Sequence, residues 1–217
     1  MSRIIIIGGH GKVARLLTAK LVATNDSVTA IIRNPAHAVD VQADGAHPEV
    51  FDIEHASLEQ IVGVLKEHDA VVWSAGAGGG SPNRTYAVDR DAAIQTMDAA
   101  ARAQVKRFVM VSYARSGLEE NLDPGDGFYA YAQAKAEADA YLRKSALDWT
   151  IVGPGRLTSE PASGLIATAP DGRAEDNATS RANVALVIAY VLANQLTIGK
   201  TIRFVDGEIP VDELLAA

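Results

Sequence analysis

The sequence contains no cysteine, which excludes disulfide bonds, thiolate catalysis and metal sites built from cysteine. A chain without thiols suits a reducing compartment, and we expect a cytoplasmic location. Long apolar runs are also missing near the start, where the four isoleucines at 4–7 form the longest one. That run is too short for a signal-peptide core or a membrane span. We therefore expect a protein that does not associate with a membrane.

Basic residues are outnumbered, with 20 Lys and Arg against 27 Asp and Glu and a net charge of −7. Nucleic acid and anionic membranes require a basic face, so neither is expected as the main partner. The 217 residues, 48% of them hydrophobic and 22% charged, are enough for one domain with a substantial core. We expect a single domain over 1–217 with a small-molecule substrate. A homodimer is a candidate assembly.

Apolar runs alternate with helical patterns along the whole chain. Strands are predicted at 3–7, 28–32, 49–53, 70–74, 107–112, 149–153 and 201–205. Helices are predicted near 11–23, 57–66, 84–103, 127–146 and 181–194. Short strands without polar alternation are typical of a sheet that helices cover on both faces. The pattern predicts an α/β fold with a doubly wound parallel sheet (Rossmann fold) of about seven strands. The segment 154–180 has no clear element, and we expect a loop region on the substrate side.

The first loop is rich in glycine and reads GGHGKVA over residues 8–14. Glycine permits a tight turn after a strand and lets backbone approach a pyrophosphate, while a following helix directs its free N–H groups at that phosphate. Glycines also form turns that bind nothing, but the position after the first strand favours a dinucleotide site. The residues predicted here to bind cofactor are Gly8, His10, Gly11, Lys12 and Val13.

The second predicted strand ends in Arg33 and Asn34, with no acidic residue at its tip. An acid there is typical of NAD sites, where it binds the ribose 2′-hydroxyl. A guanidinium instead binds a 2′-phosphate through charge-assisted hydrogen bonds, and Lys12 adds a second positive charge. Each cation alone is also compatible with an ordinary surface position. Together, Arg33, Asn34 and Lys12 predict NADP(H) as the cofactor.

Several motifs together resemble a known family. They are GGHGKVA, IIRNP, FDI at 51–53, WSAGAG at 73–78, VMVS at 109–112, YAQAK at 131–135 and DWTIVGPGRLT at 148–158. Over essentially its whole length the sequence resembles an atypical short-chain dehydrogenase/reductase, in the NAD(P)H-binding group that includes NmrA-like and flavin-reductase-like proteins. The resemblance implies further cofactor contacts by Asp52, Ile53, Ser74, Ala75, Gly76 and Pro154. For Asp52 a helix-capping role is the alternative, and for Gly76 a plain glycine turn.

The same resemblance implies a catalytic set of Ser112, Tyr131 and Lys135. Tyr131 and Lys135 lie one helical turn apart on one face. An adjacent ammonium favours the phenolate and brings a tyrosine closer to its working range. Lys135 would also bind the nicotinamide ribose, and Ser112 would hold the substrate carbonyl. The alternative for Tyr131 is a packing role with Lys135 as its solvated neighbour.

Other charged residues give weaker signals. The five histidines show no ligand-like spacing, and no metal site is predicted. Residues 89–91 (Asp-Arg-Asp) are expected to form a solvated helix face.

The sequence therefore predicts an NADP(H)-dependent oxidoreductase acting on a small carbonyl or quinone-like compound. One alternative is a nucleotide-sugar epimerase or dehydratase, although such relatives carry a larger C-terminal substrate domain. The other is an NmrA-like sensor that binds NADP(H) and alters a protein partner without catalysis.

Overall fold

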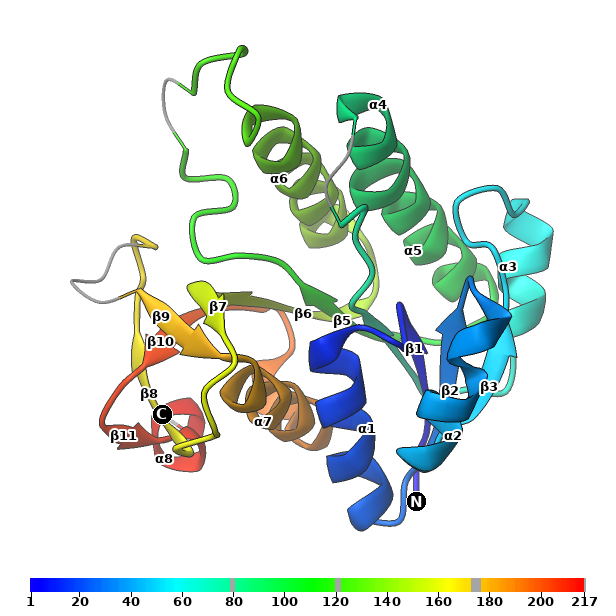
Figure 1. Ribbon diagram of the computed structural model, residues 1–217, viewed down its shortest axis with the longest axis horizontal. Coiled ribbons are helices and arrows are strands. Elements are labelled where there is room, and N and C mark those ends of the chain that lie inside the picture. Colours follow the sequence, from blue (N-terminus) through cyan, green and yellow to red (C-terminus); the bar gives the residue numbers. More distant parts are fainter. Residues whose placement is uncertain (79–80, 120–121, 173–176, 217) are drawn as a thin grey trace.

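Seven parallel strands form the centre of the sheet, and they correspond to the seven predicted apolar runs (Figure 1). The computed structural model describes residues 1–78, 81–119, 122–172 and 177–216. The seven strands are β1 (Arg3–Ile7), β2 (Ser27–Ile32), β3 (His47–Val50), β4 (Ala70–Trp73), β5 (Arg107–Val111), β6 (Asp148–Pro154) and β10 (Lys200–Asp206). Their order is β3-β2-β1-β4-β5-β6-β10, with every neighbouring pair parallel. The doubly wound Rossmann arrangement is confirmed.

The complete sheet has nine strands rather than seven. β8 (Leu165–Thr168) pairs antiparallel with β10, and β11 (Ile209–Pro210) pairs antiparallel with β8 at the sheet edge. β7 (Arg156–Thr158) and β9 (Ala178–Ser180) form a separate two-stranded parallel sheet. The expectation of a loop without elements over 154–180 is therefore wrong for the described part, and 173–176 lie outside the described residues. Strands of two to four residues are too short to show a clear period in the sequence.

The third strand lies earlier than predicted, at His47–Val50 instead of 49–53. The chain turns at Asp52, whose side-chain Oδ1 accepts a hydrogen bond from the N–H of Glu54 at 3.1 Å. Aspartate favours turns because it can bind backbone two residues ahead in this way. Residues 51–53 therefore form a loop beyond the strand end.

Helices cover both faces of the sheet (Figure 1). They are α1 (Lys12–Ala23), α2 (Ala38–Ala43), α3 (Leu58–Leu65), α4 (Pro82–Thr85), α5 (Ala93–Arg102), α6 (Tyr129–Lys144), α7 (Arg181–Ala193) and α8 (Val211–Ala216). Shorter turns are the 3-10 helices η1 (Pro35–His37) and η3 (Gln195–Thr197), and η2 (Tyr86–Ala92) is a π-helix that joins α4 to α5. Helices α1 and α7 pack on one face, and α3, α5 and α6 pack on the other.

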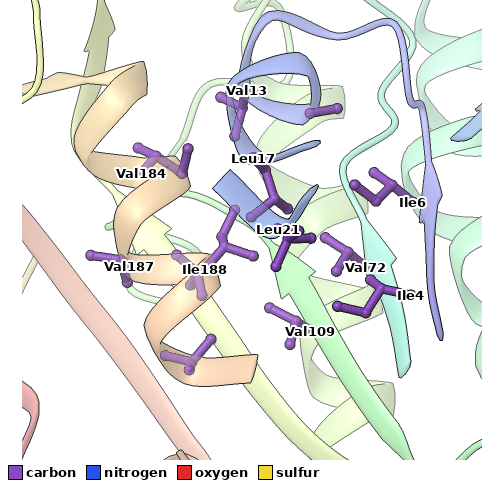
Figure 2. Packing of buried hydrophobic residues seen from close by; sticks show 14 of the residues in the cluster. Ile4, Ile6, Val13, Leu17, Leu21, Val72, Val109, Val184, Val187 and Ile188 are labelled. Carbon is purple, nitrogen blue, oxygen red and sulfur yellow. The ribbon is translucent and has the colours of Figure 1, made fainter. Parts of the chain in front are cut away.

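Strand β1 explains why the predicted runs are apolar without interruption. Successive strand side chains point to opposite faces. Ile4 and Ile6 pack toward α1 and α7 beside Leu17 and Ile188 (Figure 2), whereas Ile5 and Ile7 belong to the core cluster on the other face. Both faces are buried, so every position of the strand is apolar.

The chain winds outward in both directions from β1, to β2 and β3 on one side and to β4, β5 and β6 on the other. In such sheets, ligands bind beyond the carboxyl ends of the strands at this switch point. The fold therefore places the glycine loop, the β2 end and the β4 end together. Within the described ranges, no helix combines the length and the apolar character needed to cross a membrane.

Candidate active site

A cleft of about 570 Å³ opens at the carboxyl ends of β1, β2 and β4. We call it the glycine-loop cleft. The predicted cofactor residues that line it are Gly8, His10, Gly11, Arg33, Asn34, Asp52, Ile53, Ser74, Ala75 and Gly76. Four others lie outside this lining. Lys12 is exposed at the start of α1, Val13 packs in the core beside Val184 (Figure 2), Lys135 is buried on α6, and Pro154 ends β6.

The glycine loop is shaped by close backbone approaches. Gly8 has φ +84°, and a Cβ there would lie 2.7 Å from Cα of Ala75 in the loop after β4. A Cβ on Gly9 would lie 2.5 Å from Cβ of Ala30 on β2. The first two glycines therefore let the loop fit between its neighbouring strand ends.

Gly11 faces the cleft as the residue before α1. It is exposed, and the helix start has no side-chain cap and no acidic residue in its first turn. The first N–H groups of a helix lack intrahelical partners and carry partial positive charge. This uncapped start beside a side-chain-free residue fits a pyrophosphate.

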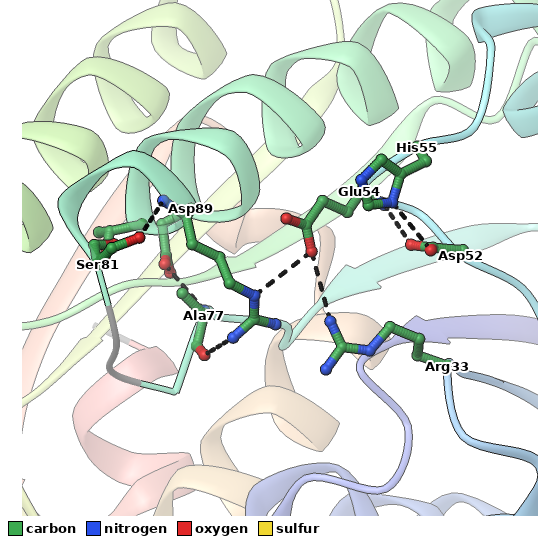
Figure 3. A network of polar contacts seen from close by, with 9 residues as sticks. Arg33, Asp52, Glu54, His55, Ala77, Ser81 and Asp89 are labelled. Carbon is green, nitrogen blue, oxygen red and sulfur yellow. Dashed lines mark hydrogen bonds and ion pairs between the residues drawn. The ribbon is translucent and has the colours of Figure 1, made fainter.

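An ion-pair network crosses the end of the cleft near β2 (Figure 3). Arg33 Nη1 lies 3.4 Å from Oε2 of Glu54, and Arg84 Nε lies 3.6 Å from the same oxygen. Arg84 also donates to the carbonyl of Ala77 at 2.6 Å. The Glu54 side chain is 14% exposed and that of Arg33 is 59% exposed. Glu54 and Arg84 both line the cleft, and neither is predicted from the sequence.

Asp52 forms a second part of this network. Its carboxylate lies 3.0 Å from Nδ1 of His55 (Figure 3). That contact, together with the backbone hydrogen bond from Glu54, holds the pKa of Asp52 below its usual value. Ligand atoms of Asp52, Glu54 and His55 lie within 4.8 Å of one another. Two guanidinium groups lie at the Glu54 carboxylate, so we describe this cluster as an ion-pair network.

A second cavity of about 350 Å³, the aromatic cavity, lies at the end of β6. Tyr131 and Pro154 line it together with Tyr113 and Phe128. The three aromatic rings lie 5.4 to 5.5 Å apart between centroids. The hydroxyl of Tyr113 is buried and has no hydrogen-bond partner in the described parts of the chain. The structure thus places the predicted catalytic tyrosine and a predicted cofactor-binding proline at one cavity.

Lys135 lies one turn after Tyr131 on α6, as predicted, but its ammonium group bonds to the end of β5 and not to Tyr131. It is fully buried, and Nζ donates to the carbonyl of Val111 at 2.8 Å and contacts Sδ of Met110 at 3.6 Å. Burial lowers the pKa of Lys135, against the opposing effects of Asp139 and Asp89.

The pKa of Tyr131 moves in the direction opposite to our expectation. Burial raises it, and the nearby carboxylate of Asp89 acts in the same direction. The expectation that Lys135 brings this tyrosine closer to neutral pH is therefore wrong for the structure. At neutral pH the hydroxyl of Tyr131 therefore keeps its proton.

Ser112 follows β5 and is buried, at 6% exposure. Its hydroxyl donates to Oδ2 of Asp139 at 2.6 Å, and the hydroxyl of Ser116 donates to the same oxygen at 2.6 Å. Ser112 lines neither the glycine-loop cleft nor the aromatic cavity. The structure therefore places Tyr131 and Lys135 one helix turn apart. The hydroxyl of Ser112 is instead hydrogen-bonded to the buried carboxylate of Asp139.

Asp89 corrects another expectation. The solvated face predicted for residues 89–91 is wrong at this position, because Asp89 is 2% exposed in the π-helix η2. Its Oδ2 accepts from the N–H of Ala77 at 3.0 Å, and burial raises its pKa. Single π-helical turns are frequent at functional sites. Asp89 supports the loop after β4 and interacts electrostatically with both Tyr131 and Lys135.

The fold and the glycine-loop cleft define a dinucleotide-binding protein of the Rossmann type. The chain belongs to the NAD(P)H-binding family, which it matches over residues 8–195, and the resemblance to atypical short-chain dehydrogenases/reductases is confirmed. It is thus an NAD(P)H-binding member of an oxidoreductase- and epimerase-like family.

Three known proteins show how close the similarity is. A candidate NAD-dependent epimerase/dehydratase of Bacillus halodurans has 31% sequence identity, a TM-score of 0.91, and coverage of 100% of this chain and 99% of that one. The oxidoreductase ylbE of Lactococcus lactis has 32% identity, a TM-score of 0.85, and coverage of 99% and 95%. The uncharacterised sugar epimerase YhfK of Bacillus subtilis is 32% identical over 98% of both chains.

Proposed function

We propose that this protein is an NADP(H)-dependent reductase of a small carbonyl or quinone-like compound. The observation that carries the proposal is the placement of Tyr131, a neutral phenol, in the aromatic cavity beside Pro154. Asp89 connects this cavity to the glycine-loop cleft, because its carboxylate holds the loop after β4 and also acts on Tyr131. A substrate in the aromatic cavity would have a proton donor on the side nearest α6.

The preference for NADP(H) is supported by the end of β2. Arg33 lines the glycine-loop cleft, and Asn34 caps η1 by accepting from the N–H of Ala36 at 3.0 Å. No carboxylate occupies the strand tip itself. Glu54 approaches Arg33 from the loop after β3, so a bound 2′-phosphate would compete with Glu54 for the guanidinium.

The protein side of the reaction is proton delivery. When bound, NADPH supplies the hydride for the carbonyl carbon. The phenol O–H of Tyr131 then donates its proton to the carbonyl oxygen, and the raised pKa keeps that proton in place at neutral pH. Lys135 lies one turn further along α6, where its ammonium group is held by the carbonyl of Val111. Pro154 and the aromatic side chains exclude water from the substrate.

An epimerase or dehydratase reaction is the second candidate, because YhfK and the Bacillus halodurans protein carry those descriptions. Such a reaction oxidises and then reduces the same substrate. The cofactor therefore stays bound, and its redox state does not change over a full turnover. A third candidate is a sensor that binds NADP(H) and does not catalyse a reaction.

One experiment separates the three. The purified protein is mixed with NADPH and a series of aldehydes, ketones and quinones, and absorbance at 340 nm is followed. Stoichiometric NADPH consumption supports the reductase. Conversion of a nucleotide-sugar with catalytic, retained NADP⁺ supports the epimerase. Bound NADPH with no turnover on any compound overturns the reductase and supports the sensor.

A further inference from the structure

Arg156 is a positively charged residue at the aromatic cavity. It is the first residue of β7, it is exposed, and it lines the cavity together with Tyr131 of α6. Among the residues that the structure describes, the side chain of Arg156 has no hydrogen-bond or ion-pair partner. The cavity therefore combines a proton donor from one element with an available guanidinium from another.

The backbone that carries Arg156 is held on both sides. Its N–H donates to the carbonyl of Asn177 at 2.7 Å, and β7 pairs it with Ala178 of β9. The N–H of the preceding Gly155 donates to the carbonyl of Phe204 on β10 at 3.0 Å. A Cβ on Gly155 would collide with the carbonyl oxygen of Asn177, so only glycine permits this close approach. The side chain of Arg156 thus starts from a fixed position at the cavity.

The other two charged residues in the described lining form an ion pair with each other. Nε of Arg115 donates to both carboxylate oxygens of Glu119 at 3.0 Å, and Nη2 lies 2.9 Å from Oε2. The two side chains are 27% and 16% exposed, so this pair is largely shielded from water. The charge that remains at the cavity is the positive charge of Arg156. It attracts an anionic group on a substrate and repels a cationic one.

The size and the walls of the cavity restrict the substrate further. Tyr113, Phe128 and Tyr131 form an aromatic wall, with ring centroids 5.4 to 5.5 Å apart. Aromatic rings at such a wall pack well against another ring in an offset or edge-on arrangement. The volume of about 350 Å³ is at the small end of ligand pockets, which run from about 300 to 1,000 Å³. This favours a single substituted ring over a nucleotide-sugar.

Resting on the proposed function, we propose that the substrate is an aromatic carbonyl compound with a carboxylate group, and that Arg156 selects it by binding this carboxylate. A guanidinium binds a carboxylate through two parallel charge-assisted hydrogen bonds. The carbonyl carbon gains the hydride of NADPH, and the carbonyl oxygen gains the proton of Tyr131. The products are the alcohol and NADP⁺, and Tyr131 regains a proton from water. The carboxylate is unchanged, so Arg156 determines specificity and takes no part in the bond changes.

The test compares 4-formylbenzoate with 4-formylbenzamide, which have nearly the same shape and differ by one negative charge. Binding is measured by titration calorimetry with NADP⁺ present, and kcat and KM are measured with NADPH. We expect the benzoate to bind about tenfold more tightly and to have an about tenfold lower KM at similar kcat, because the carboxylate contact is the same in the ground and transition states. The preference should fall at about 0.5 M NaCl, since salt screens exposed charges.

Three variants assign the preference to one residue. In Arg156→Gln the two compounds are expected to bind within about twofold of each other. Arg156→Lys keeps the charge without the planar guanidinium, so it should retain part of the preference. Arg102→Gln is the matched control. This arginine ends α5, is 61% exposed and forms an ion pair with Glu59, and its loss should leave the wild-type ratio.

The outcomes separate this inference from the function on which it rests. If both compounds are reduced without a preference for the benzoate, the inference is overturned and the reductase stands. A preference that persists in Arg156→Gln also overturns the inference, as does a wild-type protein that binds neither compound. If the benzoate binds selectively through Arg156 but no compound of the wider series consumes NADPH, the carboxylate site stands and the reductase is overturned.

Discussion

The hydroxyl of Ser112 donates a 2.6 Å hydrogen bond to Asp139, a residue 27 positions further along the chain. Asp139 is completely buried, and its Oδ2 takes a second hydrogen bond from Ser116. The family resemblance implies that this hydroxyl binds a substrate oxygen. In the structure the hydroxyl donates to Asp139 instead. This pairing separates the role of Ser112 from that of Tyr131.

Ser112→Ala should lower stability more than activity. Removing the hydroxyl takes one donor from a buried carboxylate, and a hydrogen bond to a charged group is worth about 1.5–3 kcal/mol. Ser116→Ala removes the other donor of the same oxygen and is the matched control. We expect similar losses in the free energy of unfolding, measured in urea, and less than about a tenfold loss of turnover in both. A loss of turnover of about a hundredfold or more in Ser112→Ala alone would show that the serine takes part in the reaction.

Arg33→Ala should weaken NADPH binding by about 1.5–3 kcal/mol and leave NADH nearly unchanged, because only NADPH has the 2′-phosphate. Glu54→Gln provides the reciprocal variant. It removes the carboxylate that competes for the guanidinium, so NADPH binding should tighten by up to about fivefold, within the range of an exposed ion pair. Both affinities are measured by nucleotide fluorescence. Equal binding of NADH and NADPH by the wild-type protein would contradict the assignment.

Gly11→Val should abolish binding of both nucleotides while the protein stays folded. The new side chain would stand before the uncapped start of α1, where the pyrophosphate approaches, and its Cβ would also lie 3.1 Å from the carbonyl of Gly8. Gly63→Val is the control, because a Cβ at this exposed helix position meets nothing within 4 Å. Circular dichroism establishes folding, and dialysis with NADPH measures binding. Wild-type affinity in a folded Gly11→Val protein would place the dinucleotide elsewhere.

Tyr131→Phe should reduce turnover by about 10²–10⁴, the usual contribution of a positioned general acid. The ring and its packing remain, so NADPH affinity should be unchanged. Tyr141→Phe is the control on the same helix α6: it loses an exposed hydroxyl that donates to Asp98 of α5, and it should behave as wild type. Turnover is followed on any substrate found in the NADPH screen. Full activity in Tyr131→Phe would remove the tyrosine from the reaction.

The two directions of the reaction should respond differently to pH. Burial raises the pKa of Tyr131 above its ordinary value, so the phenol stays protonated through neutral pH. Reduction needs the protonated phenol, so ionisation of Tyr131 should not lower the reduction rate between about pH 7 and 9. Alcohol oxidation needs the phenolate, whose fraction grows about tenfold per pH unit below the pKa, so its rate should rise over that range. A flat oxidation profile would show that Tyr131 is not the proton-transfer group.

The sequence predicted the parallel core well because each strand carries its own signal. Ile4 to Ile7 are apolar on both faces, which only a doubly covered strand requires. The glycine loop was predictable for the same local reason. Strands β8 and β11 were not predictable, since two to four residues at a sheet edge give no clear period.

Parts of the site depend on partners far apart in the chain. Nothing near Glu54 indicates that Arg33 and Arg84 meet at its carboxylate, and nothing near Ser112 points to Asp139. Asp89 did carry a local signal. It lies on the same three-to-four spacing as Val88, Ala92 and Thr96, the buried side of the helix, and that spacing outweighs its charge.

The π-helix η2 has a consequence for comparing this chain with its relatives. A π-helical turn holds one residue more than an α-helical turn would. Deleting one residue between 86 and 92 would therefore let the helix run on as a regular α-helix without breaking it. The wider turn absorbs the extra residue, so the side chains before and after the deletion would keep nearly the same directions around the axis. Arg84 would stay beside Glu54 and Ala77, and α5 would keep its buried face. A single gap at this place in an otherwise similar sequence thus marks a protein that lacks the π-turn but keeps the rest of the cleft.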